Sequence, residues 1–481
     1  MRLNKETDSR TLVMKFGGTS VGSAEAMKQV LEILIAERQR WGNIAVVISA
    51  MSGVTDMLIE SALDAKLGHS DTFHRTAGEL RKKHYAVVDE LLPDLARKAQ
   101  VKHEIDHLIS DFVNLCQAIT VIGEASPRAL DAVAALGERL NVRTLAAVLD
   151  ANGVPAQYVE ATQLIVANSE FQAAHPDLEA SRSHSRQVLE PLFLQGRIPV
   201  VTGFIAATLE GAIVTLGRGG SDYSAAILGA VLPADEVWIW TDVDGVMTAD
   251  PRLVVSAHTI PELSYREIAE LAYFGAKVLH PKTIRPVIEA GIPLRVCNTF
   301  NPKNPGTRLL ANINGQVAGA IKAVTAIQGQ SLITLEGRGM LGVPGVAART
   351  FGAVAATGTS VPLITQASSE QSICFAVPIE AVNQVIVSLE SAFKDEIDSQ
   401  DIDRVWSTDE VVIITVVGAG MRNTPGIAGR IFTALGNKLV NVIAVAQGSS
   451  EVSISLVVDA MQAENGVKAL HELIEKELSN G

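Results

Sequence analysis

Short apolar runs alternate with amphipathic stretches along residues 1–310. The apolar runs predict β-strands at 12–16, 44–51, 156–159, 199–206, 237–241 and 293–297. After Ser23, apolar residues recur with the helical period at Met27, Val30, Leu31, Leu34 and Ile35, which predicts a helix. Residues 57–150 carry helical patterns almost throughout and indicate a helical insertion between two strands. Strands alternating with helices are typical of an α/β domain, a mainly parallel sheet between helical layers.

The C-terminal third of the chain contains an internal repeat with a constant offset of 81 residues, as from 339 to 420. Gly339-Met340 and Pro344-Gly345 recur as Gly420-Met421 and Pro425-Gly426, and QASSE at 366–370 recurs as QGSSE at 447–451. Each copy has the pattern strand, glycine turn, helix, strand, strand, helix. The first copy, 329–410, ends in a further strand near 404–407, which the pattern of the second copy, 411–481, lacks. We therefore expect the apolar run 321–327 to complete the second module, which would comprise 320–328 and 411–481.

Composition narrows the class of protein. The chain has 481 residues, enough for about three domains at roughly 150 residues each. With 47% apolar and 19% charged residues, it is typical of a globular protein rather than of a disordered one. A net charge of −13 and an aromatic content of 4% give no indication of a surface that binds nucleic acid. Cys116, Cys297 and Cys374 are far apart, each in an apolar run, and fit reduced thiols.

Membrane and targeting segments are not predicted. The longest weakly polar stretch, 200–217, is interrupted by Glu210 before it could span a bilayer. Residues 2–10 are rich in charge and precede only a short apolar run, so the pattern contains no signal-peptide core. We expect a cytoplasmic protein that begins at Met1 and has no membrane partner.

One string resembles a zinc-protease motif. Residues 103–107 read HEIDH, which fits the pattern H-E-x-x-H. The apolar stripe of the same helix comprises Ile105, Leu108, Ile109, Phe112 and Cys116, so both histidines fall on the polar face. We interpret the string as part of a solvent-exposed helix face; a metal site with Glu124 as a third ligand is the alternative.

A second string resembles a dinucleotide-binding fingerprint. Residues 337–342 read GRGMLG, which fits G-x-G-x-x-G between a predicted strand and a predicted helix. The next strand ends at Thr365-Gln366 without the acidic residue that would hold a ribose, and the repeat places Asn423 where the third glycine would be. We therefore favour a tight turn in a repeated module over a dinucleotide site. The pattern of a Walker P-loop does not occur in the sequence.

Four turns after predicted strands combine glycine, hydroxyl and charged side chains. They are KFGGTS at 15–20, SAMSGVT at 49–55, GRGGSD at 217–222, and the segment 240–252 followed by FGAK at 274–277. Glycines at the start of a helix let backbone amides approach an anion, and Lys15 adds a positive charge. Each turn alone is as typical of a capping turn or a surface ion pair. Because ligands bind at the carboxyl ends of parallel strands, the four together predict an anion-binding site there.

The order of these motifs closely resembles that of the aspartate kinases. KFGGTS, GRGGSD, WTDVDG at 240–245 and FGAKVLHP at 274–281 are followed by the doubled module, and the resemblance spans about residues 11–478. It implies an amino-acid kinase fold in 1–310, followed by two ferredoxin-like ACT modules, which sense amino acids. It also implies phosphorylation of the β-carboxylate of L-aspartate to 4-phospho-L-aspartate by ATP with Mg²⁺, the first step towards lysine, threonine and methionine.

The resemblance implies roles for individual residues. The catalytic residues would be Lys15, Asp222 and Lys277. L-Aspartate would be held by Ser49, Thr55, Glu124 and Arg218, with Arg218 at the α-carboxylate and Glu124 near the ammonium group. ATP would be bound by Lys15, Gly17, Gly18, Thr241, Asp242, Met247, Arg252, Lys277 and Val278. The amino-acid effector would be bound by Met340, Gly345, Gln366 and Gln447, and no metal-ligating side chain is implied.

The chain departs from the family pattern at two positions. Met247 stands where many relatives have a tyrosine that contacts the nucleotide, which alters the expected adenine contacts. Pro362 stands where lysine-sensing relatives tend to carry an acidic residue. The turns at Gln366 and Gln447 are similar to those of the bifunctional aspartate kinases that respond to threonine, so the resemblance favours threonine over lysine as the inhibitor.

Two other functions remain open at this point. A different amino-acid kinase, acting on glutamate, acetylglutamate, carbamate or UMP, would share the fold. A non-catalytic amino-acid sensor would share the ACT modules but would be expected to lack Lys15, Arg218, Asp222 or Lys277, which are all present. We expect a homodimer or higher homo-oligomer, and a kinase without a fused dehydrogenase because the repeat extends almost to Gly481.

Overall fold

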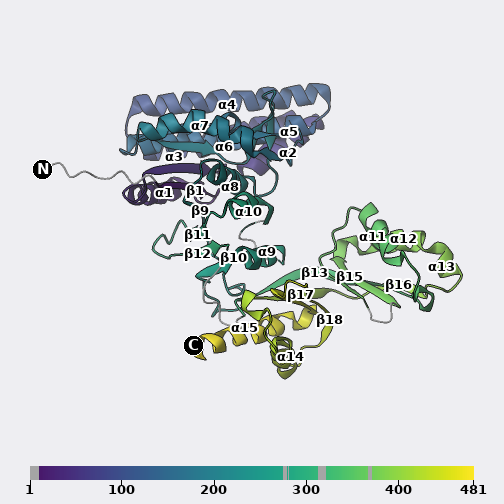
Figure 1. Ribbon diagram of the computed structural model, residues 1–481. Helices are drawn as coiled ribbons and strands as arrows, with labels where there is room; N and C mark the ends of the chain where they lie inside the picture. The colour runs from purple at the N-terminus through teal and green to yellow at the C-terminus, as the bar shows by residue number, and fades with distance from the viewer. Residues whose placement is uncertain (1–9, 275–278, 280, 312–320, 367–370, 481) are drawn as a thin grey trace. The chain divides into compact units, whose positions relative to one another are not determined.

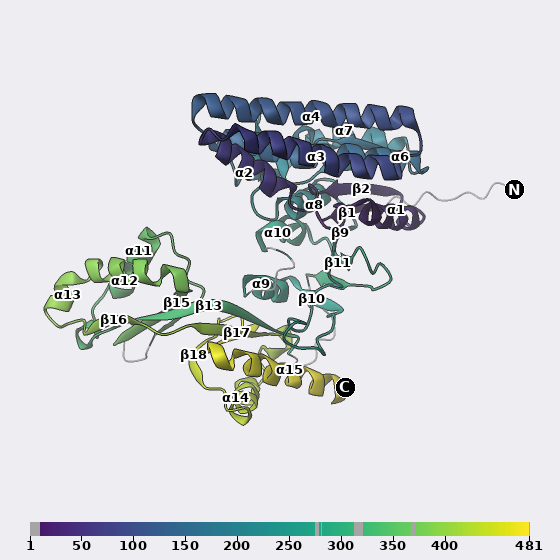
Figure 2. The ribbon, with the colours of Figure 1, turned by 180° about the vertical axis from the view of Figure 1, so that it is seen from behind.

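The computed structural model describes residues 10–274, 279, 281–311, 321–366 and 371–480. The chain divides into two compact units (Figures 1 and 2). The first comprises Met1–Val246, Pro261–Tyr265 and Val278–Asn312, and the remainder forms the second. The second unit therefore includes residues 247–260 and the helix that begins at Tyr265, except for Tyr265 itself. Both segments lie inside the expected kinase domain, 1–310.

The first unit contains a sheet that is mostly parallel. Its strand order is β10-β12-β11-β9-β1-β2-β6-β3, and only the β11–β12 pair is antiparallel. These strands are β1 (Thr11–Phe16), β2 (Asn43–Ile48), β3 (Ala156–Val159), β6 (Ile198–Thr202), β9 (Glu236–Thr241), β10 (Glu262–Ser264), β11 (Leu294–Asn298) and β12 (Thr307–Leu310). A smaller sheet is formed by β4 (Val166–Ala167), β5 (Pro176–Asp177), β7 (Ile205–Ala207) and β8 (Ile213–Thr215). The expected α/β architecture is confirmed.

Helices cover both faces of the large sheet. On one face, α1 (Ala24–Glu37) and α6 (Leu136–Ala151) share a core with Leu12, Met14 and Phe16 of β1. The alternate residues of β1 point to the other face, where α8 (Gly220–Val231) packs on β1, β2 and β9. The remaining helices of this unit are α2 (Val54–Lys66), α3 (Ser70–Leu91), α4 (Leu95–Ile122), α5 (Pro127–Ala134), α7 (Leu178–Leu194) and α10 (Pro281–Ala290).

Each strand predicted before residue 300 and the predicted first helix has an observed counterpart, although β2 ends at Ile48 rather than at residue 51. Ser23 caps α1, since its hydroxyl accepts a hydrogen bond of 3.1 Å from the Ala26 amide. The helical insertion is confirmed as α2 to α6, between β2 and β3. The single strand predicted at 199–206 is divided into β6 and β7, because Phe204 has a φ of 68° and turns the chain.

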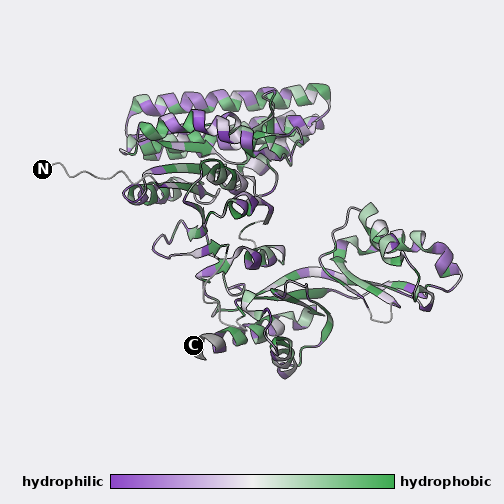
Figure 3. Cartoon of the chain, viewed as in Figure 1, coloured by the Kyte–Doolittle hydropathy of each residue, from purple (hydrophilic) through white to green (hydrophobic). Residues whose placement is uncertain are grey.

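Helix α4 carries the HEIDH string. Its predicted apolar stripe is confirmed, because Ile105, Phe112 and Cys116 are completely buried, whereas Asp106 of the string faces Arg81, with an Nε–Oδ1 distance of 2.6 Å. The described residues contain no group of three ligating side chains suited to a metal ion. Among the described residues, α4 is also the one helix whose length and apolar composition would allow it to cross a membrane. Figure 3 shows polar and apolar residues alternating along it.

The second unit contains a mainly antiparallel sheet and carries α9 (Tyr265–Tyr273). The order of its main path is β14-β15-β13-β17-β19-β18, with β16 paired to β13. These strands are β13 (Ala323–Glu336), β14 (Ile364–Gln366), β15 (Ser372–Pro378), β16 (Arg404–Ser407), β17 (Val411–Val417), β18 (Val442–Ala446) and β19 (Ser453–Asp459). Its C-terminal helices are α11 (Val346–Ala356), α12 (Val382–Ala392), α13 (Lys394–Asp398), α14 (Ile427–Asn437) and α15 (Ala463–Asn480).

Strand β13 connects the two copies of the repeat. Its first half, Ala323–Ile327, pairs with β17 of the second copy, and its second half, Gln330–Glu336, pairs with β15 of the first. The apolar run 321–327 thus lies beside the second copy of the repeat, where we expected it to supply the missing strand. The register shifts between Ile327 and Gln330, so one bulged strand replaces the two separate strands of the sequence pattern.

The GRGMLG string forms a turn before α11. A Cβ atom on Gly339 would lie 2.6 Å from the Cα of Asp401, so the glycine allows a close approach of two backbones. The Gly339 amide donates a hydrogen bond of 2.9 Å to the Asp401 carbonyl. Close packing thus explains Gly337 and Gly339, and a φ of 69° explains Gly342, which supports the interpretation as a tight turn.

Candidate active site

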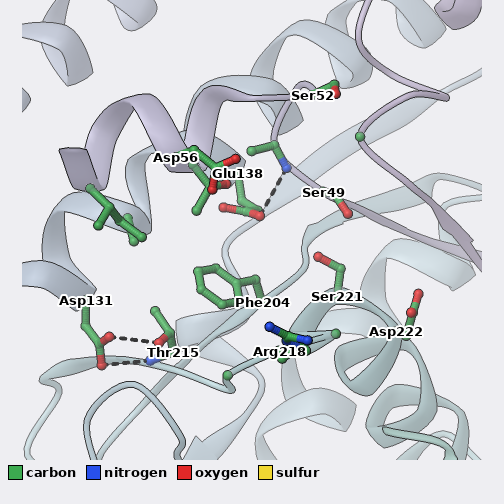
Figure 4. Close-up of a pocket in the computed structure, with 18 of the residues that line it drawn as sticks. Ser49, Ser52, Asp56, Asp131, Glu138, Phe204, Thr215, Arg218, Ser221 and Asp222 are labelled. Atoms are coloured by element: carbon green, nitrogen blue, oxygen red, sulfur yellow. Dashed lines mark hydrogen bonds between the residues drawn. The ribbon is translucent and has the colours of Figure 1, made fainter. Parts of the chain in front are cut away.

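A cavity of about 590 Å³ lies at the carboxyl ends of β1 and β2 in the first unit (Figure 4). The residues around it come from the ends of β1, β2 and β8 and the turns after them, from helices α2, α5, α6 and α8, and from the turns that contain Gln172 and Phe204. Of the predicted site residues, it is lined by Lys15, Gly18, Ser49, Thr55, Arg218 and Asp222. Residues as far apart in the sequence as Lys15 and Asp222 are therefore brought to one place, as expected for a parallel sheet.

Lys15 and Asp222 form an ion pair inside this cavity. The Lys15 Nζ atom lies 2.6 Å from Asp222 Oδ1, and the two side chains are 11% and 15% exposed. Lys15 is on the face of β1 opposite to Leu12, Met14 and Phe16, which is the face that α8 covers. Asp222 lies in the first turn of α8, so the alternation of the strand directs the lysine towards it.

The glycines after β1 allow a close approach of two turns. A Cβ atom on Gly18 would lie only 2.9 Å from the Ala50 carbonyl oxygen and 3.2 Å from the Ser52 nitrogen. The Ser52 amide donates a hydrogen bond of 3.2 Å to the Gly18 carbonyl. The turn after β1 and the turn after β2, which contains Ser49, are thus held together by backbone contacts. Gly17 lies in the same turn near Lys15 Nζ.

Arg218 provides a cation in the cavity that is open to a ligand. Its side chain is exposed, and no carboxylate is paired with it among the residues that the structure describes. It lies between two glycines with positive φ, Gly217 and Gly219, directly before α8. A guanidinium without an ion-pair partner can bind a carboxylate by donating two parallel hydrogen bonds to it.

Glu138 of α6 is a buried acid in the same cavity that the sequence interpretation missed. Its residue is 3% exposed, and its Oε1 atom accepts a hydrogen bond of 3.1 Å from the Ala50 amide. No hydrogen-bond partner of Oε2 occurs within the described ranges. Burial raises the pKa of Glu138 to about 8. The available signal was a lone acid within the apolar stretch 133–149.

Glu124, which was expected in this role, is not brought to the cavity. It is exposed in the turn after α4, which ends at Gly123 with a φ of 71°. The resemblance implied that an acid of the helical insertion contacts the substrate, and only packing shows which acid of this insertion faces the ends of β1 and β2.

Asp131 of α5 is a second buried acid that the sequence interpretation did not identify. Its residue is 1% exposed. Its carboxylate accepts hydrogen bonds from the Gln172 amide (2.9 Å), the Thr215 amide (3.0 Å) and the Thr215 hydroxyl (2.8 Å). Figure 4 shows Asp131 and Thr215 at one end of the cavity.

The predicted nucleotide-binding residues are distributed over several parts of the structure. Thr241 and Asp242 lie at the carboxyl end of β9, joined by a hydrogen bond of 3.2 Å. Met247 and Arg252 belong to the second unit, where Arg252 is 2.6 Å from Asp250. Lys277 and Val278 lie outside the described residues.

The predicted effector residues all lie in the second unit. Met340 is buried in the turn before α11, and Gly345, with a φ of 91°, is the residue before that helix. Gln366 is the last residue of β14, Gln447 follows the corresponding strand β18, and both are exposed.

Comparison with known proteins identifies both parts of the chain. The amino acid kinase family matches residues 10–298, and an ACT domain family matches residues 333–393 and 414–473. The bifunctional aspartokinase/homoserine dehydrogenase of Daucus carota is 37% identical over 95% of this chain and 50% of its own length. The chain therefore spans about half the length of the bifunctional relatives that it matches.

Two aspartokinases without that second activity in their names match over more of their length. Aspartokinase 1 of Arabidopsis thaliana is 31% identical over 98% of this chain and 83% of its own. Aspartokinase III of E. coli, solved with lysine and aspartate, is 29% identical with a TM-score of 0.79 and covers 97% of this chain and 100% of its own. The same enzyme solved with aspartate and ADP has a TM-score of 0.76, 28% identity, and coverage of 96% and 99%. The chain belongs to the amino acid kinase family and, within it, to the aspartokinases with ACT domains.

Proposed function

We propose that this protein is an aspartate kinase that transfers the γ-phosphoryl group of ATP to the β-carboxylate of L-aspartate. The observation that carries the proposal is the set of charges in the 590 Å³ cavity. The same space is lined by a buried acid, Glu138, by the Lys15–Asp222 ion pair, and by Arg218, whose guanidinium has no ion-pair partner among the described residues. An amino dicarboxylic acid has one ammonium and two carboxylate groups, and it complements this arrangement.

In this proposal Arg218 binds the α-carboxylate, and Glu138, in place of Glu124, binds the ammonium group. The free Oε2 atom of Glu138 supplies an acceptor inside the cavity, and an adjacent ammonium group stabilises the ionised carboxylate. Ser49 and Thr55 supply polar contacts nearby. Two fixed charges and the cavity wall then leave the β-carboxylate directed towards Lys15.

The reaction needs positioning and charge neutralisation rather than a general base. One oxygen of the β-carboxylate, already ionised at pH 7, forms a bond to the γ-phosphorus as the bond to the β,γ-bridging oxygen breaks, giving 4-phospho-L-aspartate and ADP. Lys15 neutralises charge on the transferring group, and Asp222 holds its ammonium group in place. The turn containing Gly17 and Gly18 offers backbone amides to the phosphates.

ATP is proposed to bind as its Mg²⁺ complex. Mg²⁺ in such complexes is held largely by the phosphate oxygens of the nucleotide. Mg²⁺ supplies charge neutralisation on these oxygens when it is bound. Thr241 and Asp242, at the end of β9, are the proposed protein contacts of the nucleotide within the first unit, and Met247, Arg252, Lys277 and Val278 remain proposed contacts from sequence.

The ACT modules are proposed to bind threonine as a feedback inhibitor. The proposal depends on Pro362, which provides no carboxylate for the ε-ammonium group of lysine. Met340, Gly345, Gln366 and Gln447 are the proposed contacts. Titration of activity with threonine and lysine separately tests this, and inhibition by lysine alone would overturn it.

We further propose a homodimer formed through the ACT modules. Strand β18 at one edge of the sheet exposes Ile443 (44%) and Val445 (37%), and such apolar edges tend to be covered by a second chain. Sedimentation equilibrium measures the mass in solution, and a monomer at all concentrations would contradict the proposal.

The activity itself is tested by hydroxamate formation with aspartate, ATP and Mg²⁺, with glutamate as the control substrate. We expect aspartyl hydroxamate and equimolar ADP, and little product from glutamate. Equal or faster reaction with glutamate would favour another amino-acid kinase. Absence of phosphoryl transfer, with amino-acid binding retained, would favour a sensor.

A further inference from the structure

Asp131 occupies an unusual position for an acid, since it is buried without a cationic partner among the described residues. Its three hydrogen bonds come from two segments far away in the sequence, the turn at Gln172 and strand β8 at Thr215. Burial raises the pKa of Asp131, and these three donors oppose that shift. Such a group is costly to bury, so its contacts should serve more than local packing.

One of these contacts stabilises a strained turn. Gln172 has a φ of 70°, which is uncommon for a residue other than glycine, and its amide is bound to Asp131 Oδ2. The Gln172 carbonyl oxygen lies against Gly217, where an added Cβ atom would be 3.1 Å away. The carboxylate thus fixes a turn that contacts the residue directly before Arg218.

The other contacts hold the strand that leads to Arg218. Thr215 is the last residue of β8 and is bound to Asp131 through both its amide and its hydroxyl. Arg218, three residues later, has no ion-pair partner of its own within the described ranges. The position of Arg218 therefore depends on the backbone of residues 215–219. Asp131 holds this backbone directly through Thr215 and indirectly through Gln172, which contacts Gly217.

We propose that Asp131 is a positioning residue for substrate binding, acting through Thr215 and Gln172 to hold Arg218 where it receives the α-carboxylate. The inference rests on the proposed function and adds to it a residue that does not touch the reacting atoms. Because Arg218 acts on binding rather than on the transferring phosphoryl group, loss of Asp131 weakens aspartate binding and leaves the chemical step largely intact.

The main test is Asp131→Asn, which keeps the size of the side chain but replaces the charged acceptor of three hydrogen bonds with a neutral amide, whose NH₂ group can at best donate to the Thr215 hydroxyl. We expect the KM for aspartate to rise about tenfold or more, from the usual worth of hydrogen bonds to a charged group. We expect kcat at saturating aspartate and the KM for ATP to stay within about twofold to threefold, as for loss of uniform binding.

Milder variants keep the test valid if Asp131→Asn does not fold. Thr215→Val removes one donor and keeps the amide, so a smaller rise in the KM for aspartate is expected. Thr215→Ser restores the hydroxyl and should restore the KM. Asp177→Asn is the matched control, because Asp177 also accepts two backbone amides, at the start of α7, but does not line the cavity.

The outcomes separate this inference from its alternatives. Equal changes in the KM for aspartate and for ATP, a fall in kcat alone, or a Thr215→Ser variant as impaired as Thr215→Val would overturn it and indicate a purely structural role. Aspartate binding is also measured by calorimetry without ATP. A wild-type protein that binds aspartate but does not phosphorylate it refutes the proposed function, while the binding constants of the variants still decide the role of Asp131.

Discussion

Lys15 and Glu138 line one cavity, and a change at each predicts a different kinetic effect. Lys15→Ala removes the cation that is proposed to neutralise the transferring group and leaves Asp222 without its partner. We expect kcat to fall by about 10²-fold to 10³-fold, in the range for loss of one transition-state donor. The KM for aspartate should change much less, because Arg218 and Glu138 remain.

Steady-state kinetics with both substrates varied measures this. Lys28→Ala is a suitable control, since Lys28 forms an exposed ion pair with Glu90 on the surface of the same unit. A near-normal kcat for Lys15→Ala would remove Lys15 from the proposed mechanism.

Glu138 predicts a dependence of aspartate binding on pH. Burial raises its pKa to about 8, so the free protein holds a proton on this carboxyl group at pH 7. A bound ammonium group favours the ionised form, and binding therefore releases the proton. The affinity for aspartate should increase between pH 6 and 8, by up to about tenfold per pH unit, and level off above.

Calorimetry at pH 7 in buffers of different ionisation enthalpy counts the protons released. Glu138→Gln should release none and bind aspartate more weakly. The same proton count in both proteins would contradict the assignment.

The ionisation of Glu138, which favours aspartate binding, lowers the stability of the free protein. A raised pKa means that the contribution of Glu138 is fully present below its ordinary value of 4.5 and is lost as the pH rises through about 8. Glu138→Gln should therefore gain Tm relative to the wild type between pH 5 and pH 8. Differential scanning calorimetry at both pH values measures this, and an unchanged difference in Tm would be the contrary result.

At the scale of elements, the turns after β1 and β2 can be tested through their glycines. Gly18→Ala would place a Cβ atom 2.9 Å from the Ala50 carbonyl oxygen, a backbone atom that cannot move alone. A Cβ atom on Gly17 would approach no atom of another residue closer than 3.5 Å. We expect Gly18→Ala to cost about 1–3 kcal/mol of unfolding free energy, as for overpacking, and Gly17→Ala to cost less.

Denaturant unfolding of the two variants gives this comparison directly. Similar midpoints would show that the two turns are not held in the close contact described. The comparison uses neighbouring positions with the same substitution, so differences in helix or strand propensity largely cancel.

At the scale of the whole molecule, the second unit contains more than the ACT repeat. The segment 247–260 packs into the core of the second ACT copy, where Ala249 and Val254 contact its apolar side chains. The Val324 amide of β13 donates a hydrogen bond of 2.8 Å to the Thr248 carbonyl, and the Thr248 hydroxyl lies 2.8 Å from His471 Nε2. This segment follows Thr241 and Asp242 closely in the chain, so it connects the regulatory unit to the proposed nucleotide contacts.

His471→Leu tests this connection. Loss of the buried contact with Thr248 should shift the half-maximal inhibitor concentration by about threefold to tenfold, from a worth of about 1 kcal/mol per hydrogen bond. The value of kcat without inhibitor should remain within about twofold, because His471 is not placed in the cavity. Inhibition curves that coincide with those of the wild type would show that this contact carries no coupling.

The sequence by itself determined the elements and the motifs, because both depend on short-range patterns. Hydrophobic periodicity identified the strands, the helical insertion and the apolar stripe of α4. Self-comparison identified the repeat and its displaced strand. The glycine-rich turns and Lys15 were found because a strand followed by glycines is a local signal.

Only the tertiary structure decided which distant side chains meet. It placed Glu138 rather than Glu124 in the cavity, since the face that a helix presents to a site depends on which strand ends it packs against. It revealed Asp131, whose partners are 41 and 84 residues away. It also assigned 247–260 to the regulatory unit, because burial of Ala249 and Val254 depends on a core formed by residues beyond 320. Such contacts leave no period in the sequence, and only packing determines them.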